Sequence, residues 1–246
     1  DLVIEYNKMV AKLGESAVAL AKSEREGAWR EMARQVAHEI KNPLTPMKLS
    51  IQYLQKAINN NLPNVKELSG SVANTLVEQI DHLSKIAADF SQFANISTTS
   101  VELFDLHEVI GSLKDLYQHN SSVEIDWKPV NERVMIQADK TQMNRLFTNL
   151  FANAMEACNG TAVCRIEVVE EREDGTIRIS VKDNGEGIAP DMQSKIFSPN
   201  FTTKSSGTGL GLAMCKGIVE QAKGKIWFET GHEKGTTFHV ELSLAN

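Results

Sequence analysis

Two long stretches of the sequence repeat apolar residues at steps of three and four, and this repeat limits most strongly what the chain can fold into. The first stretch runs from about residue 8 to 60 and the second from 72 to 94. Such steps trace one face of an α-helix. The polar tract NNNLPN, at 59–64, combines asparagines with a proline, which ends a helix and turns the chain. We therefore predict two long antiparallel helices, over about 14–60 and 65–96.

A hairpin of two helices leaves part of each apolar stripe uncovered, because one partner helix cannot bury both faces. A second copy of the chain would cover them by completing a four-helix bundle. The alternative is a monomeric hairpin that packs on the downstream part of the chain. We expect the dimeric bundle.

After residue 100 the pattern changes to short β-branched and aromatic runs that alternate with helical stretches, as in an α/β sandwich. The doublet DG at 174–175 and the GHEKG turn at 231–235 lie between strand-like runs, so we expect antiparallel hairpins there and a mixed sheet. The expected strands are VELF, VEIDW, VMIQA, CRIEVV, TIRISV, KIWFET and TTFHVEL, and the expected helices lie near 106–118, 140–157 and 210–222.

Charge and cysteine content narrow the class of protein. The net charge is -6 and no basic stripe is present, which argues against a nucleic-acid partner. The three cysteines have spacings that match neither a zinc site nor a disulfide framework, so we expect reduced, buried thiols. No apolar run approaches the roughly 18 to 20 residues that span a bilayer. Because the sequence starts at Asp1 without a methionine, we expect a fragment of a longer protein.

Two glycine-rich segments, DNGEGI at 183–188 and GTGLGL at 207–212, flank the polar loop SPNFTTKSS. Glycines at this spacing let backbone N–H groups approach an anion closely. The second segment leads into a predicted helix, whose N-terminus favours phosphate. Taken alone, GTGLGL also fits an ordinary turn. Together the segments predict a nucleotide triphosphate site, with a mobile lid over about 192–208.

The predicted helix before the sheet contains NLFANAMEA, which places Asn149 and Asn153 four residues apart on one helix face. Two neutral oxygen ligands suit a Mg²⁺ ion that keeps most of its waters and phosphate ligands. The alternative is a pair of surface asparagines without a ligand. The neighbouring glycine segments favour the metal.

The stretch HEIKNPLTP, at 38–46, puts two prolines inside the first predicted helix. Pro43 and Pro46 each remove a ladder hydrogen bond, at a cost of about 3 kcal/mol each in a helix interior. His38 and Asn42 lie four residues apart on one helix face, with Glu39 beside them, and none of the three belongs to the apolar stripe, so this face should be accessible to solvent. A neutral imidazole can act as a nucleophile while a carboxylate accepts its other proton. The alternative is a surface histidine beside a surface glutamate.

Together, these motifs resemble those of bacterial sensor histidine kinases, in the order found in that family. HEIKNPLTP matches the phosphoacceptor box, NLFANAMEA the N box, DNGEGI and GTGLGL the two glycine boxes, and FSPNFTTK the F box. The N box continues as MEAC, where many members carry a basic residue, which resembles the nitrogen-regulation branch and leaves more of the phosphate-side charge to Lys204 and Arg145.

The resemblance implies a domain order. Residues 1–13 would be the tail of a HAMP-like signal-relay segment, and 14–98 the dimerisation and histidine phosphotransfer domain. Residues 101–246 would be a Bergerat-type (GHKL) catalytic ATP-binding domain of the kind shared with gyrase. Missing upstream segments would anchor the full-length protein in the bacterial inner membrane, with this portion in the cytoplasm.

The implied activity is ATP-dependent autophosphorylation of His38 within a homodimer, with Glu39 as the base. The phosphoryl group would then pass to an aspartate of a response regulator receiver domain. Asn42 matches the position that holds water for phosphatase activity. The alternatives are a Bergerat-fold ATPase clamp and a degenerate kinase that acts as a scaffold or phosphatase.

The resemblance also implies a site for ATP and Mg²⁺. Asn153 would hold the Mg²⁺ ion and Asp183 would bind the adenine amino group, with Thr236 close to it. Lys204 and the amides of 207–212 would surround the phosphates. The implied nucleotide-binding residues are Asn149, Asn153, Asp183, Gly185, Gly187, Ile188, Lys204, Gly207, Thr208, Gly209, Leu210, Gly211, Leu212 and Thr236.

Overall fold

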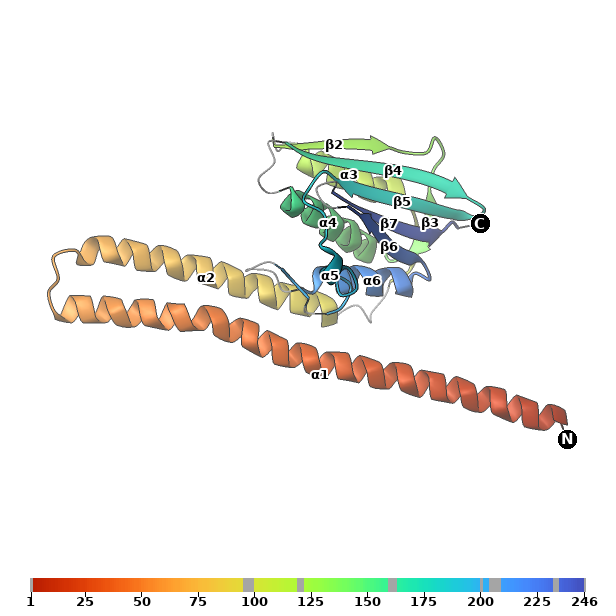
Figure 1. Cartoon of the computed structure of the whole chain (residues 1–246), viewed down its shortest axis with the longest axis horizontal. Helices are drawn as coiled ribbons and strands as arrows, with labels where there is room; N and C mark the ends of the chain where they lie inside the picture. Colours follow the sequence, from red (N-terminus) through yellow and green to blue (C-terminus); the bar gives the residue numbers. More distant parts are fainter. Residues whose placement is uncertain are drawn as a thin grey trace. The chain divides into compact units, whose positions relative to one another are not determined.

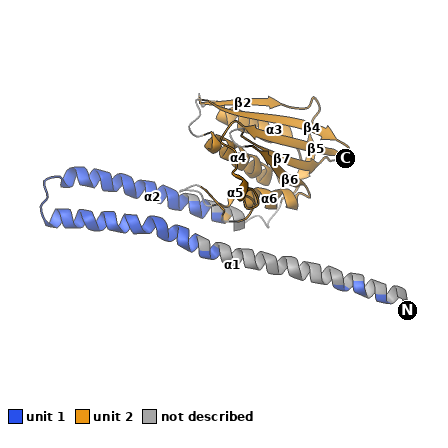
Figure 2. Ribbon diagram, viewed as in Figure 1, with its two compact units in different colours: residues 1–90 blue, residues 91–246 orange. Residues whose placement is uncertain are grey.

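A computed structural model of the chain divides it into two compact units, residues 1–90 and 91–246 (Figure 2). Only a few side chains of residues 2–35 are described. The structure describes residues 2–94, 100–118, 122–158, 163–199, 201–203, 209–231 and 235–245.

The first unit is a hairpin of two antiparallel helices, α1 (Leu2–Asn59) and α2 (Val65–Ala94) (Figure 1). The hairpin is the one that the apolar repeat predicts. However, α1 begins at Leu2 instead of near residue 14, because a single glycine such as Gly14 costs a helix only about 1 kcal/mol and does not end it. In the described part of the chain, no helix is both long and apolar enough to cross a membrane.

The hairpin leaves many apolar side chains uncovered, as the sequence predicts. Ala57, Val72 and Ile86 are buried. Leu44 on α1 is 47% exposed and Val77 on α2 is 58% exposed. Other large apolar side chains that are exposed on the two helices are Ile40, Leu49, Ile51, Tyr53, Ile58 and Ile80. The helical unit therefore carries apolar faces that its own two helices do not cover.

The second unit is an α/β domain with a mixed five-stranded sheet in the order β2-β4-β5-β7-β6. Strands β2 and β4 are parallel and the other neighbours are antiparallel, while β1 and β3 form a separate antiparallel pair. The elements are β1 (Glu102–Asp105), α3 (Leu106–Tyr117), β2 (Val123–Lys128), β3 (Met135–Ala138), α4 (Lys140–Ala157), β4 (Cys164–Glu173), β5 (Thr176–Asp183), α5 (Pro190–Gln193), α6 (Gly211–Gln221), β6 (Lys225–Thr230) and β7 (Thr236–Ser243).

Both predicted antiparallel hairpins are confirmed. Strands β4 and β5 are joined by Asp174 and Gly175, whose φ angles of 34° and 83° lie in the left-handed region that a tight turn requires. Strands β6 and β7 pair so that Thr230 lies opposite Thr236. The second hairpin therefore brings two hydroxyl side chains together at one end of the sheet.

The core of the second unit lies between α3, α4 and α6 and one face of the sheet (Figure 1). Alternate residues of the strands enter this core: on β5, Ile177, Ile179 and Val181 are buried, while Lys182 is exposed. Helix α4 supplies Leu146, Phe147, Leu150, Phe151 and Ala154 to the same core.

Part of the expected lid is built differently from the prediction. Ile196 is buried, and the ring of Phe197 packs edge-on against Phe228 with a centroid distance of 6.0 Å. This part of the segment is anchored in the core because its apolar side chains reach the sheet. Residues 200 and 204–208 lie outside the described residues.

The prediction of three reduced thiols was wrong for two of them. Cys158 at the end of α4 and Cys164 at the start of β4 form a disulfide, with their Cα atoms 5.3 Å apart. Their spacing in the sequence matches no framework, but the fold returns the start of β4 to the end of α4. Cys215 is a free, buried thiol as predicted, and burial raises its pKa to about 12.

Candidate functional site

The stretch HEIKNPLTP, predicted to be the phosphoacceptor box, lies within α1, with His38 and Asn42 exposed and Glu39 half-buried. The predicted accessibility of this face is confirmed for His38 and Asn42. Both side chains project from one helix face because they are four residues apart. The imidazole of His38 is therefore open to a reactant from outside the hairpin.

Asp183, the last residue of β5, is a buried carboxylate held by backbone amides. It is 4% exposed, and its Oδ1 accepts hydrogen bonds from the N–H of Gly185 at 2.8 Å and of Thr236 at 3.1 Å. Burial raises the pKa of Asp183 above its usual value, and the two amides oppose this shift. Within the described residues both amides use Oδ1, so Oδ2 can receive a donor from a ligand.

The loop after Asp183 packs directly on the end of α4. A Cβ atom on Gly185 would lie 2.5 Å from the carbonyl oxygen of Ala157, so only glycine fits. The N–H of Glu186 donates to the same carbonyl at 3.3 Å. The first glycine segment is therefore fixed against the helix that carries the N-box asparagines.

A threonine that sequence reasoning missed completes this corner. Thr230 accepts a hydrogen bond from the N–H of Ile188 at 2.9 Å, and its Oγ1 lies 3.2 Å from that of Thr236. Gly187 has a φ of 79°, and a Cβ there would lie 2.4 Å from the Gly231 carbonyl oxygen. The predicted GHEKG turn was the available signal, because it makes Thr230 and Thr236 a cross-strand pair.

The N box and the second glycine segment lie next to each other. The amide Nδ2 of Asn149 donates to the carbonyl of Arg145 at 2.9 Å. Its Oδ1 lies 2.8 Å from the place that a Cβ of Gly211 would occupy. Asn153 is half-buried one turn further along α4. The amide oxygen of an asparagine suits a hard cation, and the helix N-terminus beside it suits phosphate, so these residues fit a Mg²⁺ ion that is itself bound to phosphate.

The second glycine segment is only partly described. Gly209 has a φ of 64°, Leu210 is buried, and α6 begins at Gly211, with Leu212 packed against the core. These residues place the first amides of α6 beside Asn149. The predicted phosphate-binding residues Lys204, Gly207 and Thr208 lie outside the described residues.

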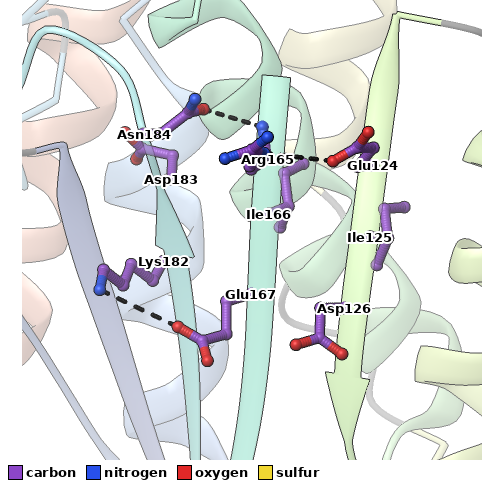
Figure 3. A pocket seen from close by; sticks show the side chains of 9 residues that line it. All are labelled: Glu124, Ile125, Asp126, Arg165, Ile166, Glu167, Lys182, Asp183 and Asn184. Carbon is purple, nitrogen blue, oxygen red and sulfur yellow. Dashed lines mark hydrogen bonds and ion pairs between the residues drawn. The ribbon is translucent and has the colours of Figure 1, made fainter. Parts of the chain in front are cut away.

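A hollow of about 420 Å³ lies along β2, β4 and the end of β5, and Asp183 is among its lining residues (Figure 3). Two ion pairs lie among its side chains: Arg165 with Glu124 at 3.1 Å and Lys182 with Glu167 at 3.9 Å. Asn184 supports the hollow by accepting from the N–H of Arg165 at 2.8 Å. The lining holds more acidic than basic side chains, which disfavours a triphosphate in this hollow.

Two family models match the chain, the first over the helical hairpin and the second over the α/β domain. The His Kinase A (phospho-acceptor) domain matches residues 28–99. The Histidine kinase-, DNA gyrase B-, and HSP90-like ATPase matches residues 138–246. The chain belongs to the sensor histidine kinases. The predicted family and the predicted fold of a helical region followed by a histidine kinase catalytic domain are thus confirmed.

Individual relatives agree with this family. A putative sensor histidine kinase NtrY-like of Rickettsia typhi is 30% identical over 99% of the chain, which agrees with the predicted nitrogen-regulation branch. The chain spans 41% of that relative's length. The catalytic domain of histidine kinase ThkA is 34% identical, with a TM-score of 0.54, over 59% of this chain and 96% of that one. Histidine kinase ThkA in complex with response regulator protein TrrA is 29% identical, with a TM-score of 0.71, over 90% of this chain and 64% of that one.

Proposed function

We propose that this chain is the kinase core of a sensor histidine kinase that phosphorylates His38 with ATP. The observation that carries the proposal is that one chain holds an exposed His38 in a matched phospho-acceptor region and a buried, amide-held Asp183 in a matched ATPase region. The first supplies an acceptor and the second a recognition group for a nucleotide. The proposed domains are 14–98 for dimerisation and phosphotransfer and 101–246 for ATP binding, preceded by a HAMP-like tail at 1–13.

In the proposed reaction, a ring nitrogen of His38 attacks the γ-phosphorus of ATP. A nitrogen–phosphorus bond forms, the bond from the γ-phosphorus to the bridging oxygen breaks, and ADP leaves with that oxygen. Glu39 accepts the proton from the other ring nitrogen, which keeps the attacking nitrogen nucleophilic. Transfer of this kind depends on positioning and on neutralising charge more than on covalent chemistry from the protein.

On the nucleotide side, Oδ2 of Asp183 would accept a hydrogen bond from the adenine amino group, and Thr236 would hold the carboxylate in place. Asn153 would bind Mg²⁺, with Oδ1 of Asn149 beside the phosphates. A bound Mg²⁺ supplies neutralisation of the charge on the transferred group. The amides of Gly209–Leu212 would bind phosphate oxygens, together with Lys204.

We propose a homodimer and a response regulator as partners. The exposed apolar side chains of α1 and α2 support the dimer, because a second hairpin would bury them. The regulator is supported by the ThkA relative, which was solved in complex with a response regulator. Asn42, exposed one turn from His38, would orient water when the same protein dephosphorylates its regulator. The full-length protein would be anchored in the membrane through segments upstream of residue 1.

The test is incubation of the chain with Mg²⁺ and γ-labelled ATP, with wild type beside His38→Gln. We expect acid-labile label in wild type and none in the variant, because phosphohistidine hydrolyses in acid. The control is Asp191→Asn, an exposed acid that the proposal does not use, which should be labelled like wild type.

Two results would contradict the proposal. Acid-stable label that persists in His38→Gln would place the phosphoryl group on another residue. Tight ATP binding without any label in wild type would favour an ATPase clamp or a scaffold, and a phosphatase assay with a phosphorylated receiver domain would separate these two.

A further inference from the structure

Asp139 makes more contacts than the cap of a helix requires. It is 8% exposed and forms the N-cap of α4, where its Oδ1 accepts from the N–H of Gln142 at 3.0 Å. Its second oxygen, Oδ2, accepts from the N–H of Ser100 at 2.8 Å. One buried carboxylate therefore joins two segments that are 39 residues apart in the sequence.

Ser100 occupies a special place in the chain. It directly follows residues 95–99, which come after the end of α2 in the sequence. Strand β1 begins two residues later, and its first residue, Glu102, pairs with Ala138, which directly precedes Asp139. The chain that arrives from α2 is thus fastened to the start of α4 twice, by the β1–β3 ladder and by the Asp139 carboxylate.

A third contact strengthens the same junction. Lys140, the first residue of α4, lies with its ammonium group 5.8 Å from the ring centroid of Phe104 on β1. Its ammonium group also pairs with Glu108 of α3 at 2.5 Å. Both β1 and α3 therefore contact α4, the helix that contains the N box, at its N-terminal end.

Further along α4 lie Asn149 and Asn153. At a rise of 1.5 Å per residue, they are about 15 and 21 Å from Asp139 along the helix axis. A helix transmits a displacement of one end to the other because its backbone is stiff on this scale. The bond between Ser100 and Asp139 therefore sets where α4, with both asparagines as one rigid body, stands relative to the chain that arrives from α2, and it leaves the asparagines' own geometry toward a nucleotide unchanged.

We propose that Asp139 is a positioning residue that couples the segment after α2 to the N-box helix, so that the two proposed domains act together in phosphoryl transfer. This inference rests on the proposed kinase function. In the proposed reaction, Asp139 contacts neither the nucleotide nor His38. Its role is to fix the position of α4 relative to the segment that contains Ser100.

The competing view is that Asp139 is an ordinary helix cap. Asparagine separates the two, because it caps helices as well as aspartate does but offers only one acceptor oxygen. In Asp139→Asn the cap on α4 can persist while the bond to Ser100 is lost. Ser100→Pro removes the donor instead, and Ser100→Ala keeps the N–H and serves as the control.

The experiment measures autophosphorylation of the full chain across ATP concentrations, together with binding of a non-hydrolysable ATP analogue. For Asp139→Asn we expect kcat to fall about five- to thirtyfold, while KM and the analogue Kd stay within twofold of wild type. Ser100→Pro should show the same split, and Ser100→Ala should behave as wild type. The double variant of Asp139→Asn with Ser100→Pro should be no worse than either single one, because both break one contact.

Unchanged kcat in Asp139→Asn, beside an active wild type, would overturn the inference. So would a rise in KM and Kd at constant kcat, or additive losses in the double variant, since these indicate a cap that only supports the nucleotide site. Absence of acid-labile label in wild type is a different result and contradicts the proposed function itself.

Discussion

Replacing Asp183 by asparagine should preserve the stability of the second unit while it weakens the binding of nucleotide. The carboxylate is buried, and its raised pKa means that the charged form is disfavoured in the fold. An asparagine side chain has nearly the same shape, and its Oδ1 can still accept from the N–H groups of Gly185 and Thr236. The variant should therefore fold at least as well as wild type at neutral pH.

The sign of the pH dependence follows from the direction of the shift. Below the unfolded pKa of about 3.9, Asp183 is protonated in both the folded and the unfolded state, so its ionisation does not reduce the free energy of unfolding. As the pH rises through the higher folded pKa, the unfolded chain ionises more easily and wild type loses stability. The difference in unfolding free energy between Asp183→Asn and wild type should grow over this window and then level off.

Nucleotide binding should change in the opposite direction. A hydrogen bond to a charged group contributes about 1.5 to 3 kcal/mol, so its loss weakens binding about tenfold to a hundredfold. The asparagine Nδ2 would also place a donor against the donor of the adenine amino group. Calorimetric titration with an ATP analogue measures the Kd, and urea unfolding from pH 4 to 8 measures stability, with Asp191→Asn as control. A Kd within threefold of wild type would refute the role of this carboxylate, and a flat stability difference would refute the linkage argument.

Three further predictions follow from contacts in the second unit. Gly185→Ala should destabilise it by about 1 to 3 kcal/mol in urea unfolding, because the new Cβ meets a backbone oxygen. Reduction of the Cys158–Cys164 disulfide should lower stability by about 2 kcal/mol through loop entropy, and reductant should not affect a Cys158→Ala, Cys164→Ala variant. Burial lowers the pKa of His239, so stability should fall as the pH drops below about 6.5, where the unfolded chain takes the proton first. His239→Phe should remove this part of the pH slope, and an unchanged slope would contradict it.

The elements of the second unit could be predicted because each buries one face. The run TIRISV alternates residues that pack on the helices with residues that face away, and the structure places β5 over 176–183 accordingly. The same reasoning located the helices over 106–117 and 140–157 to within a residue. Periodicity is a local property of the chain, so it can be read without knowledge of the partner elements.

Contacts between distant elements could not be read in this way. Thr230 and Asp183 lie on different strands, and both bind the loop that begins at Asn184. The disulfide between Cys158 and Cys164 depends on where β4 begins relative to the end of α4. These contacts are set by the order of the strands in the sheet, where β5 pairs with β7 although α5, α6 and β6 lie between them in the sequence. Motifs indicate the chemistry of the site, while the topology decides which further side chains support it.

The prolines of α1 illustrate a conflict between a local rule and the whole fold. Local propensity predicts an end or a break near Pro43, yet α1 continues through Pro43 and Pro46 to Asn59. Pro43 is buried, so its ring contributes packing, and the hydroxyl of Thr45 donates to the carbonyl of Lys41 at 3.2 Å. The carbonyls of Glu39 and Asn42 still cannot receive the ladder bonds that the proline nitrogens lack. The hydrogen-bond ladder of α1 is therefore interrupted directly beside His38, and we predict that a bend at this point would reorient the imidazole without unfolding the hairpin.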